Sequence, residues 1–141
     1  MVELLFVLSL IFFHILDDYC LQSHCLCDLK QKRWWKENAP DKKYENDYKI
    51  GLLAHSFSWS FMIHIPVVIY LIYYNQFYTD VTFMFFFTFI TNMYIHYAID
   101  DMKANKGYLN LIQDQTFHFI QLVLLYAIYV CSTYIILQNS L

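Results

Sequence analysis

The sequence predicts an all-α membrane protein in which four transmembrane helices form a bundle. Apolar residues make up 59% of the 141 positions and charged residues only 15%, against about 45–50% and about 25% in an average soluble domain. Two glycines and two prolines leave little turn material for a β fold. Four apolar segments span about residues 2–22, 50–73, 81–102 and 110–137, and we expect residues 1–141 to form a single transmembrane helical domain.

The length of each apolar segment favours a membrane span. About 20 residues of α-helix cross a hydrocarbon core of about 30 Å, and backbone groups within lipid must be hydrogen-bonded internally. The first segment is not typical of a signal peptide, because no basic residue precedes it and Asp17 and Asp18 lie where a small-residue cleavage site is expected. A soluble bundle with a large core is the alternative, but the segments are apolar on nearly every face.

Basic residues gather between the first two predicted helices and indicate which side of the membrane this segment occupies. Seven of the nine lie there, namely Lys30, Lys32, Arg33, Lys36, Lys42, Lys43 and Lys49. Lys103 and Lys106 lie between the third and fourth helices, and the turn at Asn75–Asp80 has none. The positive-inside rule therefore predicts cytoplasmic basic loops and both termini outside. Trp34 and Trp35 fit either a stretch in the lipid headgroup layer or a solvated loop.

Composition disfavours several other classes of protein. A net charge of −3 provides no basic surface for nucleic acid, so we expect membrane lipid and no nucleic acid as a partner. The spacing of the cysteines, Cys20, Cys25, Cys27 and Cys131, does not suggest a disulfide framework, and we expect free thiols. His24 with Cys25 and Cys27 lacks the second ligand pair of a zinc site. The sequence has no glycine-rich phosphate loop.

The predicted helices carry ionisable side chains, which cost about 2.5–3.5 kcal/mol each inside a membrane. They are His14, Asp17 and Asp18 in the first helix, His55 in the second, His96, Asp100 and Asp101 in the third, and Asp114 and His118 in the fourth. Three pairs have i, i+4 spacing, namely His14 with Asp18, His96 with Asp100, and Asp114 with His118. Because such residues share one helix face, each pair can present a nitrogen and an oxygen to one point.

These groups are expected at one depth and predict a metal site. They lie near the C-terminal ends of the first and third helices and the N-terminal ends of the others, roughly 5–12 Å inside the cytoplasmic boundary. Carboxylates gathered in a low-dielectric bundle need compensating charge. We predict a divalent metal, with two ions of zinc, manganese or iron, held by His14, Asp18, His55, His96, Asp100, Asp114 and His118. A proton relay or a structural polar cluster is the alternative.

Several further polar residues in the spans favour structural roles. His64 lies roughly 13 Å beyond His55 along the helix, too far to share a metal, and we expect it to be hydrogen-bonded near Pro66. Asn92 and Gln121 extend the polar stripes of the third and fourth helices, which predicts hydrogen bonds between helices or to the ligands.

Four motifs carry a resemblance to a known family. They are His14-x-x-x-Asp18-Tyr-x-Leu-Gln22 with Lys30 further on, Leu52-Leu53-Ala54-His55, His96-x-x-x-Asp100-x-x-Lys103, and Asp114-Gln115-x-x-His118. In their order and spacing the chain resembles a family of small bacterial and phage integral membrane proteins, a domain of unknown function. Asp17 departs from the pattern, where a small residue is commoner. The resemblance implies a bacterial or phage origin and location in the inner membrane. More loosely, the chain is similar to membrane-bound metal-dependent hydrolases.

The function predicted on these grounds is a metal-dependent hydrolase acting on a phosphate- or ester-containing, lipid-linked substrate at the cytoplasmic membrane interface. In the catalytic site, Lys30 and Lys103 would steer an anionic group, and Asp17 or Asp101 would act as general base. Two other functions stay open, namely an ion or proton transporter and a non-catalytic phage or bacterial membrane module that binds a host partner. A homodimer also fits a bundle of this size.

Overall fold

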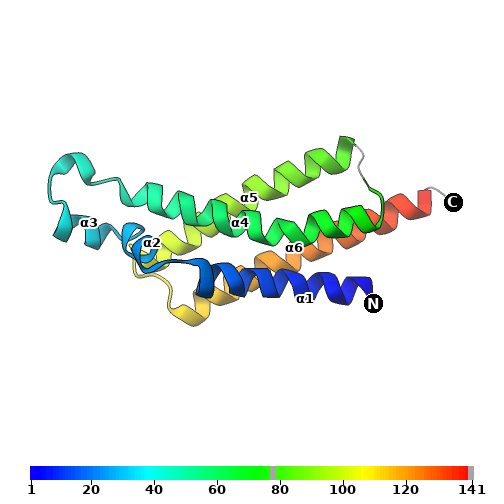
Figure 1. The fold of residues 1–141 in the computed structure, drawn as a ribbon, viewed down its shortest axis with the longest axis horizontal. Coiled ribbons are helices and arrows are strands. Elements are labelled where there is room, and N and C mark those ends of the chain that lie inside the picture. Colours follow the sequence, from blue (N-terminus) through cyan, green and yellow to red (C-terminus); the bar gives the residue numbers. More distant parts are fainter. Residues whose placement is uncertain (77–78, 140–141) are drawn as a thin grey trace.

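The structure is a computed structural model that describes residues 1–76 and 79–139, and these form helices with no strand (Figure 1). The elements are α1 (Val2–Ile15), η1 (Leu16–Leu21), α2 (His24–Leu29), α3 (Lys32–Asn38), η2 (Lys42–Tyr44), α4 (Tyr48–Tyr73), α5 (Thr79–Ala104) and α6 (Leu111–Asn139). The predicted all-α class is confirmed. Four helical stretches are long and apolar enough to cross a membrane, namely Val2–Leu21, Lys42–Tyr73, Thr79–Ala104 and Leu111–Asn139.

The helices α4, α5 and α6, and α1 together with η1, begin and end within two residues of the predicted bounds, because the apolar segments define them. Their outer faces carry large exposed apolar side chains all round the bundle, among them Leu8, Phe61, Phe87 and Val123. A surface this apolar is typical of helices that face lipid. The first residue and the end of α6 lie at one end of the bundle, and α2 and α3 lie at the other (Figure 1). We call the latter the basic end, because residues 30–49 supply most of the lysines there.

The first span is not a regular α-helix, which corrects the expectation for residues 2–22. At Leu16 it widens into the π-helix η1, where the backbone N–H of Gln22 bonds the carbonyl of Asp17, five residues back, at 3.0 Å. Short π-helical turns are rare and are found frequently at functional sites. The wider turn changes the direction of successive side chains, so that Asp17 and Asp18 both face the other helices, at 1% exposure for Asp17 and 9% for the Asp18 side chain.

The segment between the first two spans is folded rather than an open loop. The Ser23 hydroxyl caps α2 by accepting the N–H of Leu26 at 3.2 Å. The end of α2 then lies against the start of α4 at Gly51, where a Cβ would meet the Leu29 carbonyl at 2.7 Å. Trp35 of α3 donates its indole N–H to the same carbonyl oxygen at 2.8 Å. These contacts fix the position of the backbone at Lys30.

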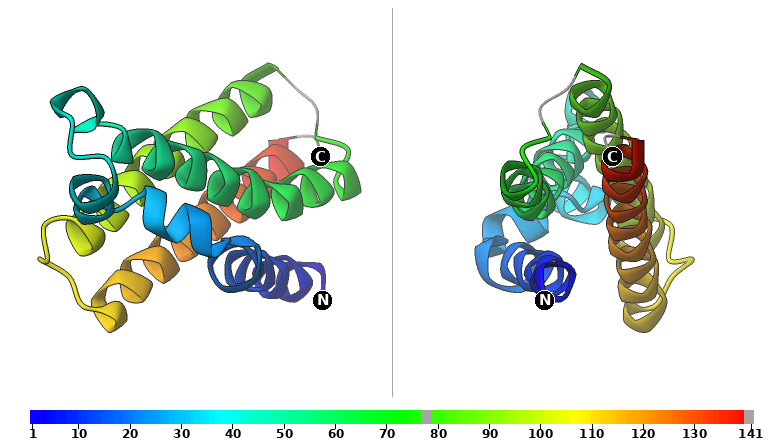
Figure 2. Two further views of the ribbon diagram at one scale, coloured as in Figure 1. Left: turned by 60° about the vertical axis from the view of Figure 1, so that its left-hand side comes forward. Right: turned by 90° about the vertical axis from the view of Figure 1, so that its right-hand side faces the viewer.

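The core divides into an apolar half and a polar half. Towards the termini the buried residues are mainly apolar, and they include Phe6, Leu10, Val67 and Leu125. Thr133 and Gln76 are also buried there and bond each other at 2.9 Å. Towards the basic end the buried side chains are mainly histidines and aspartates. The packing of the four spans brings the residues of this polar half together. Helix α4 packs against α1 and α5, and α6 packs against α1 and α5 (Figure 2).

Candidate metal centre

The four histidines predicted as ligands meet inside the bundle. His14 comes from α1, His55 from α4, His96 from α5 and His118 from α6, and each is at most 1% exposed. The rings of His96 and His118 stack with centroids 4.2 Å apart, and the centroids of His55 and His96 are 5.0 Å apart. Those of His14 and His118 are 5.9 Å apart. Each span therefore contributes one imidazole to a single cluster.

Carboxylates of three spans face these imidazoles. Nε2 of His118 lies 3.5 Å from Oδ1 of Asp100 and 3.5 Å from Oδ1 of Asp114. Nε2 of His55 lies 3.4 Å from Oδ2 of Asp100 and 3.5 Å from Oδ1 of Asp18. The predicted i, i+4 pairs lie side by side, at 3.5–3.8 Å, and contacts of 3.4–3.5 Å also join different helices.

Two groups of three residues have the geometry of a metal site. They are His96 with Asp100 and His118, and Asp18 with His55 and His96, and in each group one candidate ligand atom per residue lies within 4.8 Å of the others. The two groups share His96. Buried histidine and aspartate groups thus exist that can hold a metal ion, as the sequence predicts.

The separations between His118 and the two carboxylates fit ligands of one ion better than hydrogen bonds, whereas Nε2 of His55 and Nε2 of His96 lie 3.1 Å apart, at hydrogen-bonding distance. An N–H···O hydrogen bond measures about 2.7–3.2 Å, whereas two ligands about 2.0–2.2 Å from one tetrahedral ion lie about 3.3 Å apart. The contacts of His118 with the two carboxylates are 3.5 Å. Among the described residues, buried side-chain atoms without a hydrogen-bond partner include His118 Nε2, Asp18 Oδ1 and Asp114 Oδ1, all of which face this cluster. Several buried acceptor atoms that face one point without a hydrogen-bond donor favour a bound cation there.

The proton on His118 is placed by its neighbours. The amide nitrogen of Gln121 donates to the backbone and side-chain oxygens of Asn92, at 3.2 and 3.1 Å, so its Oε1 is an acceptor. That oxygen lies 3.3 Å from Nδ1 of His118, which therefore carries the proton in the neutral ring. Nε2 is left with its lone pair directed at the carboxylates. A hydrogen bond of this kind is how proteins orient metal-binding histidines, and it confirms the predicted role of Asn92 and Gln121.

His14 is held differently and lies outside both groups. The indole N–H of Trp59 donates to its Nδ1 at 2.9 Å, and its Nε2 lies 3.2 Å from Oε1 of Gln115. Both ring nitrogens are therefore engaged. The Gln115 amide nitrogen lies 3.1 Å from Asp114 and 3.3 Å from Asp18, so His14 orients a residue that holds two carboxylates.

The lysines proposed to steer substrate are paired with carboxylates of the cluster. Lys30 donates to Oδ2 of Asp100 at 2.7 Å, and Lys103 donates to Oδ2 of Asp114 at 2.6 Å. In both carboxylates the other oxygen, Oδ1, faces His118. The ammonium groups thus neutralise part of the buried negative charge on the side of the basic end.

The two aspartates proposed as general base have different partners. Asp17 accepts the hydroxyl of Ser58 at 2.6 Å, and its other oxygen lies 3.7 Å from Nδ1 of His55. Asp101 instead accepts from Asn105 at 2.9 Å and pairs with Lys106 at 2.8 Å. The hydrogen bond from Lys106 to that carboxylate raises the pKa of Lys106.

Sequence reasoning missed three residues that shape the cluster, namely Trp59, Gln115 and Ser58. Trp59 is fully buried and stacks on His96 with centroids 4.2 Å apart, so it forms the floor of the cluster towards the apolar half. Its position four residues after His55 puts it on the same face of α4, a spacing that could have identified it. Gln115 stands in the motif Asp114-Gln115-x-x-His118, but the motif assigned it no role. Ser58 carried no comparable signal, because its partner Asp17 lies on another helix.

A small cavity opens from the cluster at the basic end. It has a volume of about 70 Å³ and is lined by residues of η1, α4, α5 and α6 together with Lys30. Asp18, His55, Asp100 and Asp114 reach it from the cluster. A polar space of this size has room for water molecules. This cavity, which we call the mouth, therefore connects the ligand groups to the basic end.

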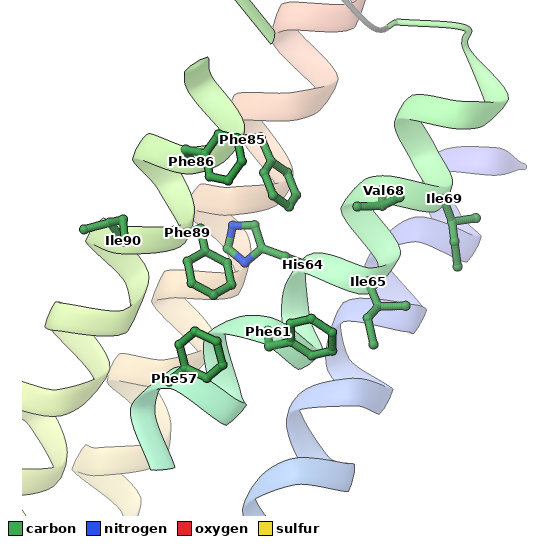
Figure 3. A pocket seen from close by; sticks show the side chains of 10 residues that line it. All are labelled: Phe57, Phe61, His64, Ile65, Val68, Ile69, Phe85, Phe86, Phe89 and Ile90. Atoms are coloured by element: carbon green, nitrogen blue, oxygen red, sulfur yellow. The ribbon is translucent and has the colours of Figure 1, made fainter. Parts of the chain in front are cut away.

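A larger cavity lies elsewhere and is apolar. It is a groove of about 640 Å³ between α4 and α5, lined by side chains that include Phe57, Phe61, Phe86 and Ile90 (Figure 3). His64, on its wall, has Nδ1 2.7 Å from the Ser60 carbonyl oxygen, which confirms the hydrogen bond expected for it. The groove offers no ligand set, and the chemistry of the molecule is concentrated at the mouth.

Comparison with known proteins leaves the site to be interpreted from its own geometry. No family model, no curated protein and no solved structure matches the chain. The resemblance drawn from the four motifs therefore stays a prediction.

Proposed function

We propose that the chain is a membrane-embedded hydrolase that uses a divalent metal ion held by His96, Asp100 and His118. The observation that carries this proposal is the set of acceptor atoms around Nε2 of His118, at separations suited to ligands of one ion. Mixed imidazole and carboxylate ligands suit zinc, manganese or iron. Because a ring nitrogen binds one ion and both groups use His96, we expect one ion at full occupancy and a second only at higher metal concentration.

The chain's own residues supply the remaining parts of a hydrolytic site. Bound at this position, a divalent ion would polarise a substrate oxygen or acidify water. His55 faces the mouth, and Asp17 lies behind its Nδ1 at 3.7 Å. This arrangement lets His55 accept a proton from water in the mouth while Asp17 stabilises the imidazolium formed. Asp101 does not reach the mouth, so we assign it no part in this chemistry.

The closed apolar half favours hydrolysis over transport. A transporter needs a polar path to both faces, but the half towards the termini is packed with Phe6, Leu10, Val67 and Leu125, all at most 4% exposed. The polar side chains that extend beyond the cluster, such as Thr88 and Asn92, bond one another or the backbone. We further propose that the basic end faces the cytoplasm, on the strength of its lysines. A carboxy-terminal alkaline phosphatase fusion should then be active, and an inactive fusion would reverse this orientation.

Elemental analysis of the purified chain tests metal binding directly. After growth with supplemented zinc, manganese and iron, the wild type should retain about one equivalent of one metal through dialysis, and His96→Ala should lose it. His64→Ala is the matched control, since His64 is a buried histidine outside the cluster, and it should retain the metal. A wild type without metal would refute the proposal.

Measurement of substrate hydrolysis distinguishes a hydrolase from a structural module in which the metal only stabilises the fold. The metal-loaded chain should release nitrophenol from nitrophenyl phosphates or esters, and Asp17→Asn should lower kcat more than metal content. Full metal content with no turnover on either substrate class would point instead to a non-catalytic membrane module.

A further inference from the structure

Three side chains that line the mouth have N–H groups that are not used in hydrogen bonds among the described residues. A lysine ammonium has three N–H donors, and in the described part of the chain Lys30 and Lys103 each use one of them on a carboxylate. Gln22 also lines the mouth, and its amide nitrogen is buried without a hydrogen-bond partner among the described residues. The three side chains come from three separate segments, yet all line one cavity of about 70 Å³.

The two lysines bond the same carboxylates that face His118. Oδ2 of Asp100 and Oδ2 of Asp114 accept from the lysines, while the Oδ1 atoms face His118. The Lys30 side chain is only 15% exposed and that of Lys103 is 36% exposed, so both are held in the protein rather than extended into solvent. The same two carboxylates therefore connect the lysine donors with the candidate metal position, and Oδ2 of Asp100 also lies 3.4 Å from Nε2 of His55.

The balance of charge at the mouth decides when an anion can bind. The ionisable side chains that line it, apart from the His55 imidazole, are three carboxylates and two ammonium groups. Their net charge is negative, so an anion is repelled. A divalent ion held by the cluster reverses the sign of this net charge. At such short range in a partly buried site, each unit of charge changes the interaction energy with an anion by several RT.

We propose that the mouth is a phosphate-oxyanion site that opens only when the cluster holds a divalent ion. Lys30, Lys103 and the Gln22 amide bind the oxygen atoms of the anion, and the ion supplies the charge that lets it enter. This rests on the proposed function and names its substrate class, a phosphate group rather than a carboxylic ester. Metal and phosphate then tighten each other's binding by the same factor, because linkage is reciprocal.

Titration of the purified full-length chain with Mn²⁺ tests this coupling. Free Mn²⁺ is followed by electron paramagnetic resonance, with and without inorganic phosphate, and with a protein-free blank for the binding of Mn²⁺ to phosphate. We expect phosphate to tighten Mn²⁺ binding about fivefold or more. A second arm replaces inorganic phosphate with nanodiscs that contain phosphatidic acid, compared with phosphatidylcholine alone. Tightening in either arm supports the proposal and shows whether the phosphate is free or on a lipid.

Variants separate anion binding from a purely structural role of the donors. Lys103→Met and Gln22→Leu should abolish the phosphate effect, while Mn²⁺ binding without phosphate stays as tight or, in Lys103→Met, becomes tighter because a competing cation is gone. Lys106→Met is the matched control, since Lys106 also pairs with an aspartate but does not line the mouth. It should keep the full effect.

The outcomes distinguish this inference from the proposed function. Mn²⁺ binding that neither phosphate arm changes would overturn the inference alone. A phosphate effect that survives in Lys103→Met and in Gln22→Leu would also overturn it, because the donors would then have no part. Failure of the chain to bind any divalent ion would refute the proposed function itself.

Discussion

Substitution of Gly51 by alanine tests how the basic end positions Lys30. A Cβ at this position would lie 2.7 Å from the carbonyl carbon and oxygen of Leu29 and 2.9 Å from the nitrogen of Lys30, whereas ordinary contact begins at 3.4 Å. The chain at Leu29 and Lys30 must therefore retreat from α4 by about 0.7 Å. An equal retreat of the Lys30 ammonium takes it from 2.7 Å to about 3.4 Å from Asp100, beyond hydrogen-bonding distance.

We expect Gly51→Ala to destabilise the chain. Helix propensity alone would instead stabilise it, by about 1 kcal/mol, so the sign of the change tests the close contact. Forced contact with backbone costs about 1–3 kcal/mol. Loss of a hydrogen bond between charged groups adds about 1.5–3 kcal/mol. We therefore expect the free energy of unfolding, measured with SDS in mixed micelles, to fall by about 1.5–5 kcal/mol.

A double-mutant cycle shows whether the loss passes through the ion pair. In a Lys30→Met background the ion pair is absent, so Gly51→Ala should cost at least about 1 kcal/mol less than in the wild type. An equal cost in both backgrounds would confine the effect to packing of α2 on α4. A Gly51→Ala variant more stable than the wild type would refute the close approach itself.

Three further outcomes follow from the cluster and its edge. Trp59→Phe removes the N–H that donates to His14, and we expect the buried acceptor to lower the free energy of SDS unfolding by about 1–3 kcal/mol; an unchanged value would contradict this hydrogen bond. Chelation should destabilise the metal-loaded wild type by about 2.7 kcal/mol when metal had been present at about 100 times its Kd, and should leave His96→Ala unchanged. Asp101 raises the pKa of Lys106 above its usual 10.5, so this pair stabilises the folded chain below about pH 10.5 and loses that contribution as pH rises through the raised pKa. The SDS-unfolding midpoints of wild type and Lys106→Met should therefore converge above that pH.

The four spans could be predicted from the sequence because membrane insertion depends on length and apolar content, and both are local properties. The identity of the buried polar residues was also within reach, since ionisable side chains in such segments almost always turn away from lipid. His14, His55, His96 and His118 accordingly occupy one cluster, although only an i, i+4 pattern and a common depth had been used to connect them.

The partners within the cluster could not be predicted, because they depend on how far each helix is rotated. A regular α-helix was assumed around Asp17 and Asp18, and the π-helical turn of η1 changes which residues share a face. The pair of Lys30 with Asp100 depends on α2 and on the contact at Gly51, in a segment for which the sequence predicts a loop or a stretch in the headgroup layer. The placement of His118 by Gln121 involves three side chains of two helices, which no spacing in the sequence specifies.

The stacking of Trp59 on His96 gives the molecule an optical readout of its own centre. The chain has three tryptophans, and the other two, Trp34 and Trp35, lie on α3 at the basic end. With those two replaced by phenylalanine, indole fluorescence would come only from the ring 4.2 Å from the His96 imidazole. A change of charge on that imidazole alters the emission of a ring stacked on it, so events at the centre become visible in real time without an added dye.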